Sequence, residues 1–455
     1  MGKKRFALAF ACGAAIVALT APNSQAAEVE RFVDVMALAY RTNPTIRAAQ
    51  ADFRSVKETR AQALSGALPQ ITASGSYENN SLTTTNQFNP ALPPQTQTVD
   101  FEPRVVGVDA EQPIFTGFQN FNAIKQANAR IRAGGADLVS VEQRVLELAA
   151  TSYFDVIRDA KVFEANQSNV AVLTRQLEEA KVRFRVGEIT KTDVAQAEAR
   201  LAGARAEFAT AQAQLAVSRA SYQEIIGQMP GTLEVSPAMP TLPESLEEAQ
   251  RLADVYAPTN VSARETEAAS RRQIAIARGA LAPRISLTAG YQYSEEPNFF
   301  TQDSEELRYG LRATVPIFQG GANYSRIREA KATNRADRQR IFEAERRTQS
   351  TVTGAWERLA AARVTISSAR AQVSANKLAL EGVRRENQVG TRTTLDVLNA
   401  EQEFLNAQVT LANAERDERA AAFGLLSASG LLTLDALSVP VEAGDANATL
   451  ISSDE

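Results

Sequence analysis

The residue types that most often perform catalysis are nearly missing from this chain of 455 residues, which has no histidine and one cysteine, Cys12. Most general acid–base sites, nucleophilic triads and transition-metal sites use an imidazole or a thiolate. Carboxylates remain as possible acids and bases, but they form no cluster typical of a pocket. The composition therefore argues against an enzyme and predicts neither a metal nor another cofactor.

Two carboxylates, Asp193 and Asp396, occupy equivalent places, each six residues after a glycine and close behind threonine. A threonine that precedes an apolar run can cap a helix, and an aspartate in the first turn is favoured by the helix dipole. Both aspartates are therefore expected at helix N-termini, just after a glycine turn. The glycines are Gly187 and Gly390, and the candidate capping threonines are Thr192, Thr393 and Thr394.

The first 26 residues have the layout of a secretory signal peptide. Lys3, Lys4 and Arg5 precede an apolar run that contains Cys12, and Ala26 ends a small-residue cleavage site. Removing this segment changes the net charge from −4 to −7, because it holds three basic and no acidic residues. That charge argues against nucleic acid as a partner. No later run reaches the roughly 20 apolar residues of a spanning helix.

The chain is predicted to contain two copies of one unit. The motif Gln-Pro-Ile-Phe-Thr-Gly at 112–117 recurs as Val-Pro-Ile-Phe-Gln-Gly at 315–320, and the match continues without a gap to Gly227 and Gly430. Upstream the offset grows from 203 to 214 residues, so the first copy has 11 extra residues, which we place in a polar loop at Asn79–Asp100. The expected divisions are a first copy at 27–227, a connector at 228–260 with a short helix near Glu244–Tyr256, a second copy at 261–430 and a partly disordered tail at 431–455.

Each copy is expected to begin with a helix and a β-hairpin, the hairpins lying at about 69–113 and about 283–316. Apolar and polar residues alternate strictly over 285–293 and 307–315, and more weakly in the first copy. Alternation over about ten residues predicts half-buried strands, and the length fits strands that cross an outer membrane. A soluble hairpin packed on a helix is the alternative. Prolines at 69, 113, 283 and 316 are expected at the strand boundaries.

Long helical hairpins are expected to follow the strands. Apolar residues at alternating spacings of three and four, such as Ala355, Leu359 and Ala362, indicate coiled-coil heptads. A continuous helix of about 70 residues would be about 100 Å long, too long for one globular domain. The two hairpins span 118–227, with a turn at Gly187, and 321–430, with a turn at Gly390.

A signal peptide followed by two copies of a strand pair and a long helical hairpin resembles the TolC family of outer-membrane efflux proteins. The sharpest part is Val-Gly-Thr-Arg-Thr-Thr-Leu-Asp-Val-Leu-Asn-Ala at 389–400, which is similar to the second helical-turn motif of that family. Residues 183–187 with 192–194 are similar to the first. The resemblance implies a mainly α fold with membrane β-structure, in which a homotrimer forms a 12-stranded barrel continued by a periplasmic coiled-coil tube. Four strands cannot close a barrel and lipid tolerates no open strand edge, so several chains must pool their strands.

The resemblance also implies the function of an outer-membrane exit duct for small toxic compounds, secreted proteins or both. Its implied partners are a periplasmic adaptor, an inner-membrane transporter of the RND, ABC or MFS type, and outer-membrane lipid. The main alternative is a periplasmic coiled-coil scaffold or adaptor without a pore of its own. An enzyme built on carboxylates is a more distant third.

In the resembled family a gate lies at the helical turns. By position, Asp193, Thr192 and Arg392 would form gate links, and Asp396 would face the pore. A ring of carboxylates at a narrow mouth would favour cations. The alternative is that Asp193 and Asp396 only cap their helices.

Two residues depart from the family pattern. Asn399 stands where a family member has a second acidic ring, so Asp396 alone is expected to supply charge. Asn387 stands where an aromatic gate partner is found, so that link is expected to be absent or different. The exposed hairpin tips are expected to dock the adaptor, and they comprise Val186, Gly187, Val389, Gly390 and Thr391.

Overall fold

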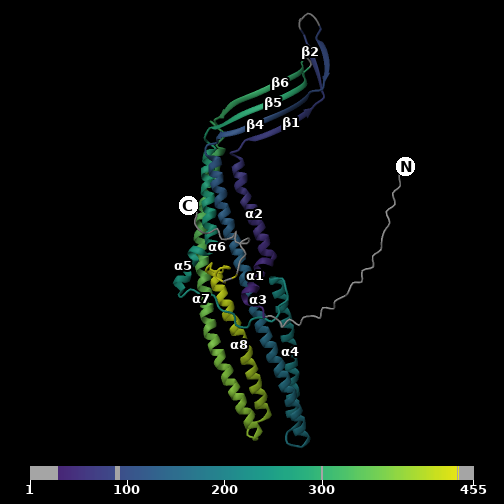
Figure 1. Cartoon of the computed structure of the whole chain (residues 1–455), viewed down its shortest axis with the longest axis vertical. Coiled ribbons are helices and arrows are strands. Elements are labelled where there is room, and N and C mark those ends of the chain that lie inside the picture. Colours follow the sequence, from purple (N-terminus) through teal and green to yellow (C-terminus); the bar gives the residue numbers. More distant parts are fainter. Residues whose placement is uncertain (1–28, 88–92, 299–300, 438, 440–455) are drawn as a thin grey trace, which may run out of the picture.

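The computed structural model describes residues 29–87, 93–298, 301–437 and 439. The molecule is long and narrow, with strands gathered at one end and helices running to the other (Figure 1). The predicted signal peptide, with Cys12, lies outside the described residues, as does nearly all of the predicted tail from 438 onward.

Helices make up most of the described chain. Two of them, α3 and α7, have 67 residues each, which corresponds to about 100 Å and matches the length expected from the heptads. In α7 the buried apolar residues Val352, Ala355, Leu359 and Ala362 follow the predicted spacings of three and four. The helices are α1 (Phe32–Thr42), α2 (Pro44–Ser65), α3 (Gln119–Arg185), α4 (Lys191–Ile226), α5 (Leu246–Tyr256), α6 (Pro258–Gly279), α7 (Ala322–Gln388) and α8 (Thr394–Ala428).

The strands form a four-stranded sheet in the order β1-β4-β5-β6, with every neighbouring pair antiparallel. The register aligns Ala73, Val108, Tyr291 and Leu307 in one row across the sheet. The predicted apolar face is therefore continuous over all four strands, and much of it is exposed, as the 83% exposure of Tyr309 illustrates. The strands are β1 (Gln70–Tyr77), β2 (Asn80–Asn86), β3 (Gln95–Phe101), β4 (Arg104–Phe115), β5 (Arg284–Asn298) and β6 (Thr301–Thr314).

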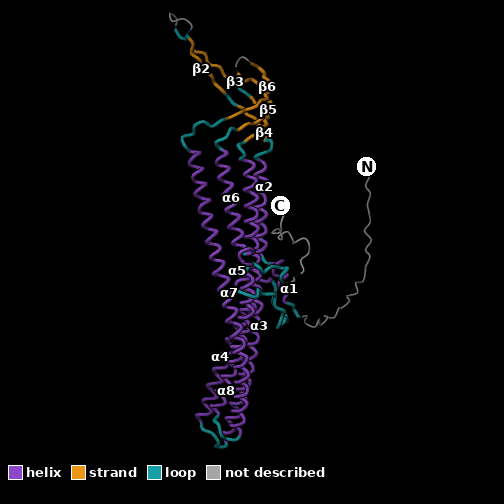
Figure 2. The backbone as a smooth tube through the Cα atoms, turned by 90° about the vertical axis from the view of Figure 1, so that its left-hand side faces the viewer, coloured by secondary structure: helices purple, strands orange, loops and turns teal. Residues whose placement is uncertain are grey.

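The interpretation of Asn79–Asp100 as a loop is wrong. The segment contains β2 and most of β3, which pair with each other and extend the first hairpin beyond the sheet, as Figure 2 shows. Thr83 bonds Thr98 across the two strands through their hydroxyl groups at 2.9 Å. Because both faces of these strands are polar, the sequence had no apolar alternation to mark them.

Pro113 was expected at a strand boundary but lies inside β4. The register of the β4–β5 pair shifts between Pro113 and Phe115. An irregularity of this kind accommodates a residue that cannot donate to the ladder.

The duplication extends further than the sequence indicated. Helix α5 begins and ends 214 residues after α1, and α6 begins and ends 214 residues after α2. The helix assigned to the connector is therefore the counterpart of α1, and only 228–245 has no partner in the first copy. Each pair is separated by a single extended residue, Asn43 or Ala257, which is followed by proline at the first helical position.

The order of the helices continues the order of the strands. In the half of the molecule next to the sheet, α2 contacts α3, α3 contacts α6, and α6 contacts α7. Each of these helices joins one strand directly, so the layer α2-α3-α6-α7 continues the sheet β1-β4-β5-β6. In the other half the long helices pair with α4 and α8 into two hairpins (Figure 1).

The largest apolar core lies at the waist of the molecule, where α1 packs on α3 and α4. Phe32 contacts the rings of Tyr153, Phe154 and Phe423, at centroid distances of 5.1 to 5.6 Å. Leu432 is also buried here, 1% exposed, so the chain stays packed past residue 430, where the tail was expected to begin. This core fixes the roots of both helical hairpins.

Within the part of the chain that the structure describes, no helix combines the length and the apolar character needed to cross a membrane.

Candidate gate at the helical hairpin tips

The two turns at the far end of the helices share one conformation. Gly187 has φ +82° and Gly390 has φ +83°, a region that favours glycine, so each chain reversal depends on its glycine. The valines that precede them, Val186 and Val389, are 73% and 75% exposed. Thr391 is exposed as well, and its hydroxyl donates to the carbonyl oxygen of Glu386 at 2.9 Å. Both tips therefore present an apolar side chain at the end of the molecule.

Asp193 and Asp396 lie in matching capping boxes. The Thr190 amide and hydroxyl donate to Asp193 Oδ2 at 2.9 and 2.8 Å, while the Asp193 amide donates to Thr190 Oγ1 at 3.3 Å. Thr393 and Asp396 repeat this arrangement with distances of 3.0, 2.8 and 3.2 Å. The expectation that Thr192 caps α4 is wrong, because the motif needs three residues between cap and carboxylate and Thr190 fills that place.

These hydrogen bonds change the acidity of both carboxyl groups. The Thr190 hydroxyl, together with the Thr190 amide, lowers the pKa of Asp193. The Thr393 amide and then its hydroxyl lower the pKa of Asp396. Both aspartates are thus held as carboxylates at the N-terminus of a helix, where the dipole also favours negative charge.

An ion pair fastens each tip to its own helix. Arg183 Nη2 lies 2.5 Å from Glu188 Oε1 in the first hairpin, and Arg392 Nε lies 2.9 Å from Glu386 Oε2 in the second. Asn387 Nδ2 donates to the Arg392 carbonyl oxygen at 2.9 Å. Asn387 therefore closes its own turn, an arrangement that an aromatic side chain could not reproduce.

The predicted gate residues are not brought together within one chain. Among the described residues, the side-chain hydrogen bonds and ion pairs of Asp193, Asp396, Asn387 and Arg392 all stay inside a single hairpin. Thr192 is exposed on the first turn of α4. Links from these residues to another copy of the chain remain a prediction.

A different set of residues joins the two hairpins. Leu398 of α8 is 2% exposed in a cluster with residues of α3 and α4, including Leu177 and Leu201. Next to it, Arg200 Nη2 donates to Asn399 Oδ1 at 2.8 Å. Asn399, predicted as a pore residue, is thus part of the seam between the hairpins.

One turn further along α8, Glu401 makes a second connection. Its carboxylate is 5% exposed and accepts from Arg384 Nε of α7 at 3.0 Å and from Gln176 Nε2 of α3 at 3.2 Å. The sequence analysis passed over Arg200, Gln176, Arg384 and Glu401, because single charged or polar residues on a heptad helix look like solvated positions.

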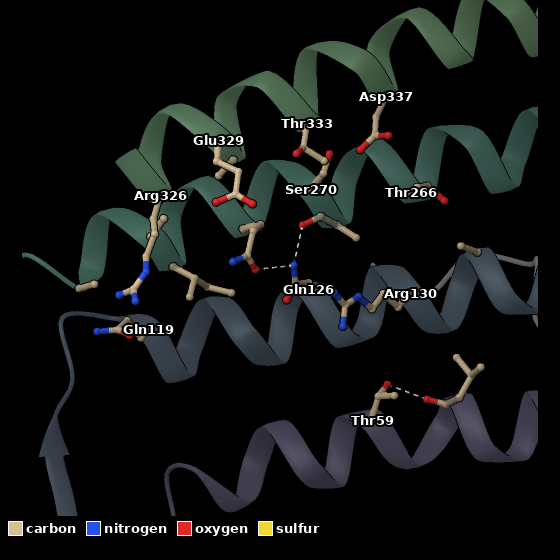
Figure 3. A pocket seen from close by; sticks show the side chains of 18 of the residues that line it. Thr59, Gln119, Gln126, Arg130, Thr266, Ser270, Arg326, Glu329, Thr333 and Asp337 are labelled. Carbon is tan, nitrogen blue, oxygen red and sulfur yellow. Dashed lines mark hydrogen bonds between the residues drawn. The ribbon is translucent and has the colours of Figure 1, made fainter. Parts of the chain in front are cut away.

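The widest hollow in the described chain lies at the other end, next to the sheet, and has a volume of about 920 Å³. Residues of α2, α3, α6 and α7 line it, so it lies on one face of the four-helix layer (Figure 3). Polar side chains dominate the view, among them Arg130, Arg326, Glu329 and Asp337. Gln126 links α3 to α6 by donating to Gln273 Oε1 at 3.0 Å.

Within the described residues, no group of three or more cysteine, aspartate or glutamate side chains is placed to hold a metal ion. The chemistry that these sites offer is that of a wetted surface, with charge, hydrogen bonding and apolar tips.

Comparison with known proteins identifies the architecture. A family model described as "Outer membrane efflux protein" matches residues 35–228 and 258–431, which are the two repeats without α5 and the segment before it. The outer membrane efflux protein BepC of Brucella suis is 31% identical over 430 residues, which is 94% of this chain and 91% of that protein. The outer membrane protein TolC of Vibrio cholerae is 25% identical, with coverage of 90% and 93%.

Solved structures show the same fold at lower identity. The CmeC outer membrane channel of Campylobacter jejuni superposes with a TM-score of 0.75 at 17% identity, over 87% of this chain and 85% of that one. The outer membrane protein VceC of Vibrio cholerae gives a TM-score of 0.72 at 19% identity, over 87% and 95%. With the family match covering most of both repeats, the chain belongs to the outer membrane efflux protein family.

Proposed function

We propose that three copies of this chain form an exit duct through the outer membrane. The duct would carry small toxic compounds, secreted proteins or both, as part of a tripartite export system. The observation that carries the proposal is the open, four-stranded sheet with an exposed apolar face, continued strand by strand into a layer of helices.

The sheet has two unpaired edges, β1 and β6. In lipid every backbone N–H and C=O group must be paired, so these edges need partners. With four alternating antiparallel strands, β6 of one copy runs opposite to β1 of the next and can pair with it. Three copies would then close a barrel of twelve strands, with the apolar face toward lipid.

The helical layer has edges on the same two sides. α2 follows β1's side and α7 follows β6's side, and each contacts only one neighbour within the described four-helix layer. Neighbouring copies would therefore join α7 to α2 as they join β6 to β1. The polar hollow in Figure 3 fits the inner wall of such a tube, because a conduit for water and polar cargo needs a wetted lining.

The hairpin tips would form the periplasmic end of the duct. Val186, Val389 and Thr391 offer a small exposed surface beyond the glycine turns, which suits the docking of a periplasmic adaptor. The adaptor would connect the duct to an inner-membrane transporter. A relative of 22% identity, from Pseudomonas aeruginosa, is called alkaline protease secretion protein AprF, while BepC is called an efflux protein, which supports both kinds of cargo.

In this assembly the duct is passive and catalyses no reaction. Asp193 and Asp396 would surround the mouth, with Arg392 and Thr192 as candidate contacts between neighbouring copies. Their shared place at the hairpin tips supports this role, and their lowered pKa keeps the two aspartates charged.

The assembly and the docking surface can be tested together in cells that lack the gene. The wild-type chain should fractionate with the outer membrane as a trimer that resists dissociation in detergent, and should restore drug resistance or secretion. Val389→Asp should form the same trimer but fail to restore export, because it removes the apolar tip without touching the turn. Gln388→Asp adds the same charge beside it and should export normally.

A soluble monomer would contradict the duct and favour the scaffold. A Val389→Asp trimer that exports as well as the wild type would contradict the docking surface alone.

A further inference from the structure

The two helical hairpins are fastened to each other just behind their tips. α8 packs along α7 and α3, and its contacts with α4 are confined to a short stretch. In that stretch Leu398 enters the apolar cluster of the α3/α4 hairpin. Beyond it, the hydrogen bonds and ion pairs of each tip stay within that tip.

Within the described residues, the bond from Arg200 to Asn399 is the one side-chain hydrogen bond between α4 and α8. No carboxylate lies within 4.0 Å of the Arg200 guanidinium in the same part of the chain, so a neutral amide is its partner. Both side chains are exposed, so water competes for the bond. A bond of this kind is strong enough to bias two positions of a helix and weak enough to break reversibly.

The location of this bond decides its consequence. Asn399 lies one helical turn after Asp396, directly behind the capping box of α8. A movement that separates the tip of α7/α8 from α3/α4 must therefore break the Arg200–Asn399 bond and withdraw Leu398 from its cluster. The capping boxes and the ion pairs of the tips need not change in such a movement.

We propose that Arg200 and Asn399 form a latch between the two hairpins that keeps the periplasmic mouth of the duct narrow. Arg200 is then a positioning residue for opening. The latch rests on the proposed function, since it requires that the hairpin tips surround a pore.

The latch is tested by single-channel recording of the purified full-length protein in planar bilayers. Arg200→Ala and Asn399→Ala should each raise the open probability about two- to fivefold, the effect of one exposed charged bond. The double variant should open no more than either single variant, because both remove the same interaction. Arg183→Ala, which breaks an ion pair inside one tip, is the matched control and should behave as the wild type.

A variant of opposite sign guards against a general loosening of the fold. Asn399→Asp would replace the amide with a carboxylate and turn the bond into an ion pair, so the open probability should fall below that of the wild type. In the Arg200→Ala background the same substitution should not lower it. Detergent-resistant trimers in all variants establish that the comparison is made on folded protein.

Each outcome has a distinct meaning. Wild-type pores with unchanged opening in Arg200→Ala and Asn399→Ala would overturn the latch and leave the duct intact. Closing by Asn399→Asp that persists without Arg200 would overturn the latch as well. A wild-type protein that forms no pore would overturn the proposed duct, and the latch with it.

Discussion

The tips of the two helical hairpins use the same devices with opposite charges. In the first, a helix-end arginine, Arg183, pairs with Glu188 in the turn. In the second, the residue 203 positions after Arg183 is Glu386, and it pairs with Arg392 in the turn. The duplicated units have thus kept the fastening of each tip while exchanging the chemical identity of its members.

The sides of the hairpins that face each other differ more deeply. Leu398 and Asn399 of the second copy correspond to Ala195 and Gln196 of the first, by the same offset of 203 residues. Leu398 is buried in the other hairpin, whereas Ala195 is exposed. The copies agree where each hairpin folds on itself and diverge where one hairpin meets the other.

Leu398→Ala is the change expected to break this asymmetry most strongly. It deletes a buried leucine from the seam, so the unfolding free energy should fall by about 2–4 kcal/mol. Leu395→Ala, one turn earlier on α8 and 38% exposed, is the control and should cost much less. Denaturant unfolding of the purified trimer measures both, and equal losses would show that the seam carries no special burial.

The capping boxes should respond equally in the two copies. Thr190→Ala and Thr393→Ala each remove one cap and should each cost about 1 kcal/mol of local helix stability. Hydrogen exchange of the first turns of α4 and α8 is the measurement. Thr192→Ala and Thr394→Ala leave the caps intact and should leave exchange unchanged, so an effect at Thr192 as large as at Thr190 would contradict the assignment of the cap.

The two aspartates should give the tips a matching pH dependence. Their pKa values are lowered in the folded protein, below the value of about 3.9 for a free aspartate. Their contribution is therefore complete above that value and is lost as the pH falls through the lower folded pKa.

Protection factors of the first-turn amides, corrected for intrinsic exchange, should fall in that acidic range. Asp193→Asn and Asp396→Asn should flatten the profile in their own hairpin only. A profile that the substitutions do not alter would assign the pH dependence to other groups.

Exchange of charges within a tip should have the smallest effect. Arg183→Glu combined with Glu188→Arg gives the first tip the polarity of the second. Because the ion pair is largely exposed, the double variant should unfold within about 0.5 kcal/mol of the wild type. A large loss in the double variant would mean that the polarity of each tip matters for contacts outside it.

Features that repeat along the chain were predictable from the sequence. The heptads, the glycine turns and the alternating face of the sheet are each written in local patterns, and the structure has them at the expected places. Two local features were missed for local reasons. β2 and β3 are polar on both faces, and the cap of α4 uses aspartate where the familiar motif has glutamate or glutamine.

The seam between the hairpins was out of reach for a different reason. Arg200 and Asn399 are 199 residues apart, and nothing in the pattern around either residue specifies the other. Asn399 was singled out only because it departs from a family pattern, and its assignment to the pore came from position alone. Pairing of this kind depends on how two long helices align, which is fixed by the waist core around Phe32 and Tyr153.

The claim that three chains close one barrel is tested most directly by cross-linking β1 of one copy to β6 of the next in outer membranes. The chain without its predicted signal peptide has no cysteine, so Ser74→Cys can be combined in turn with Glu306→Cys, Gly310→Cys or Arg312→Cys, which lie on the same face of the sheet. At least one pair should bring its Cα atoms within about 7 Å and form disulfides on oxidation. The result expected is a covalent trimer on a non-reducing gel, with Ser74→Cys alone giving none. Monomers with every pair, in protein shown to be in the outer membrane, would contradict the closed barrel.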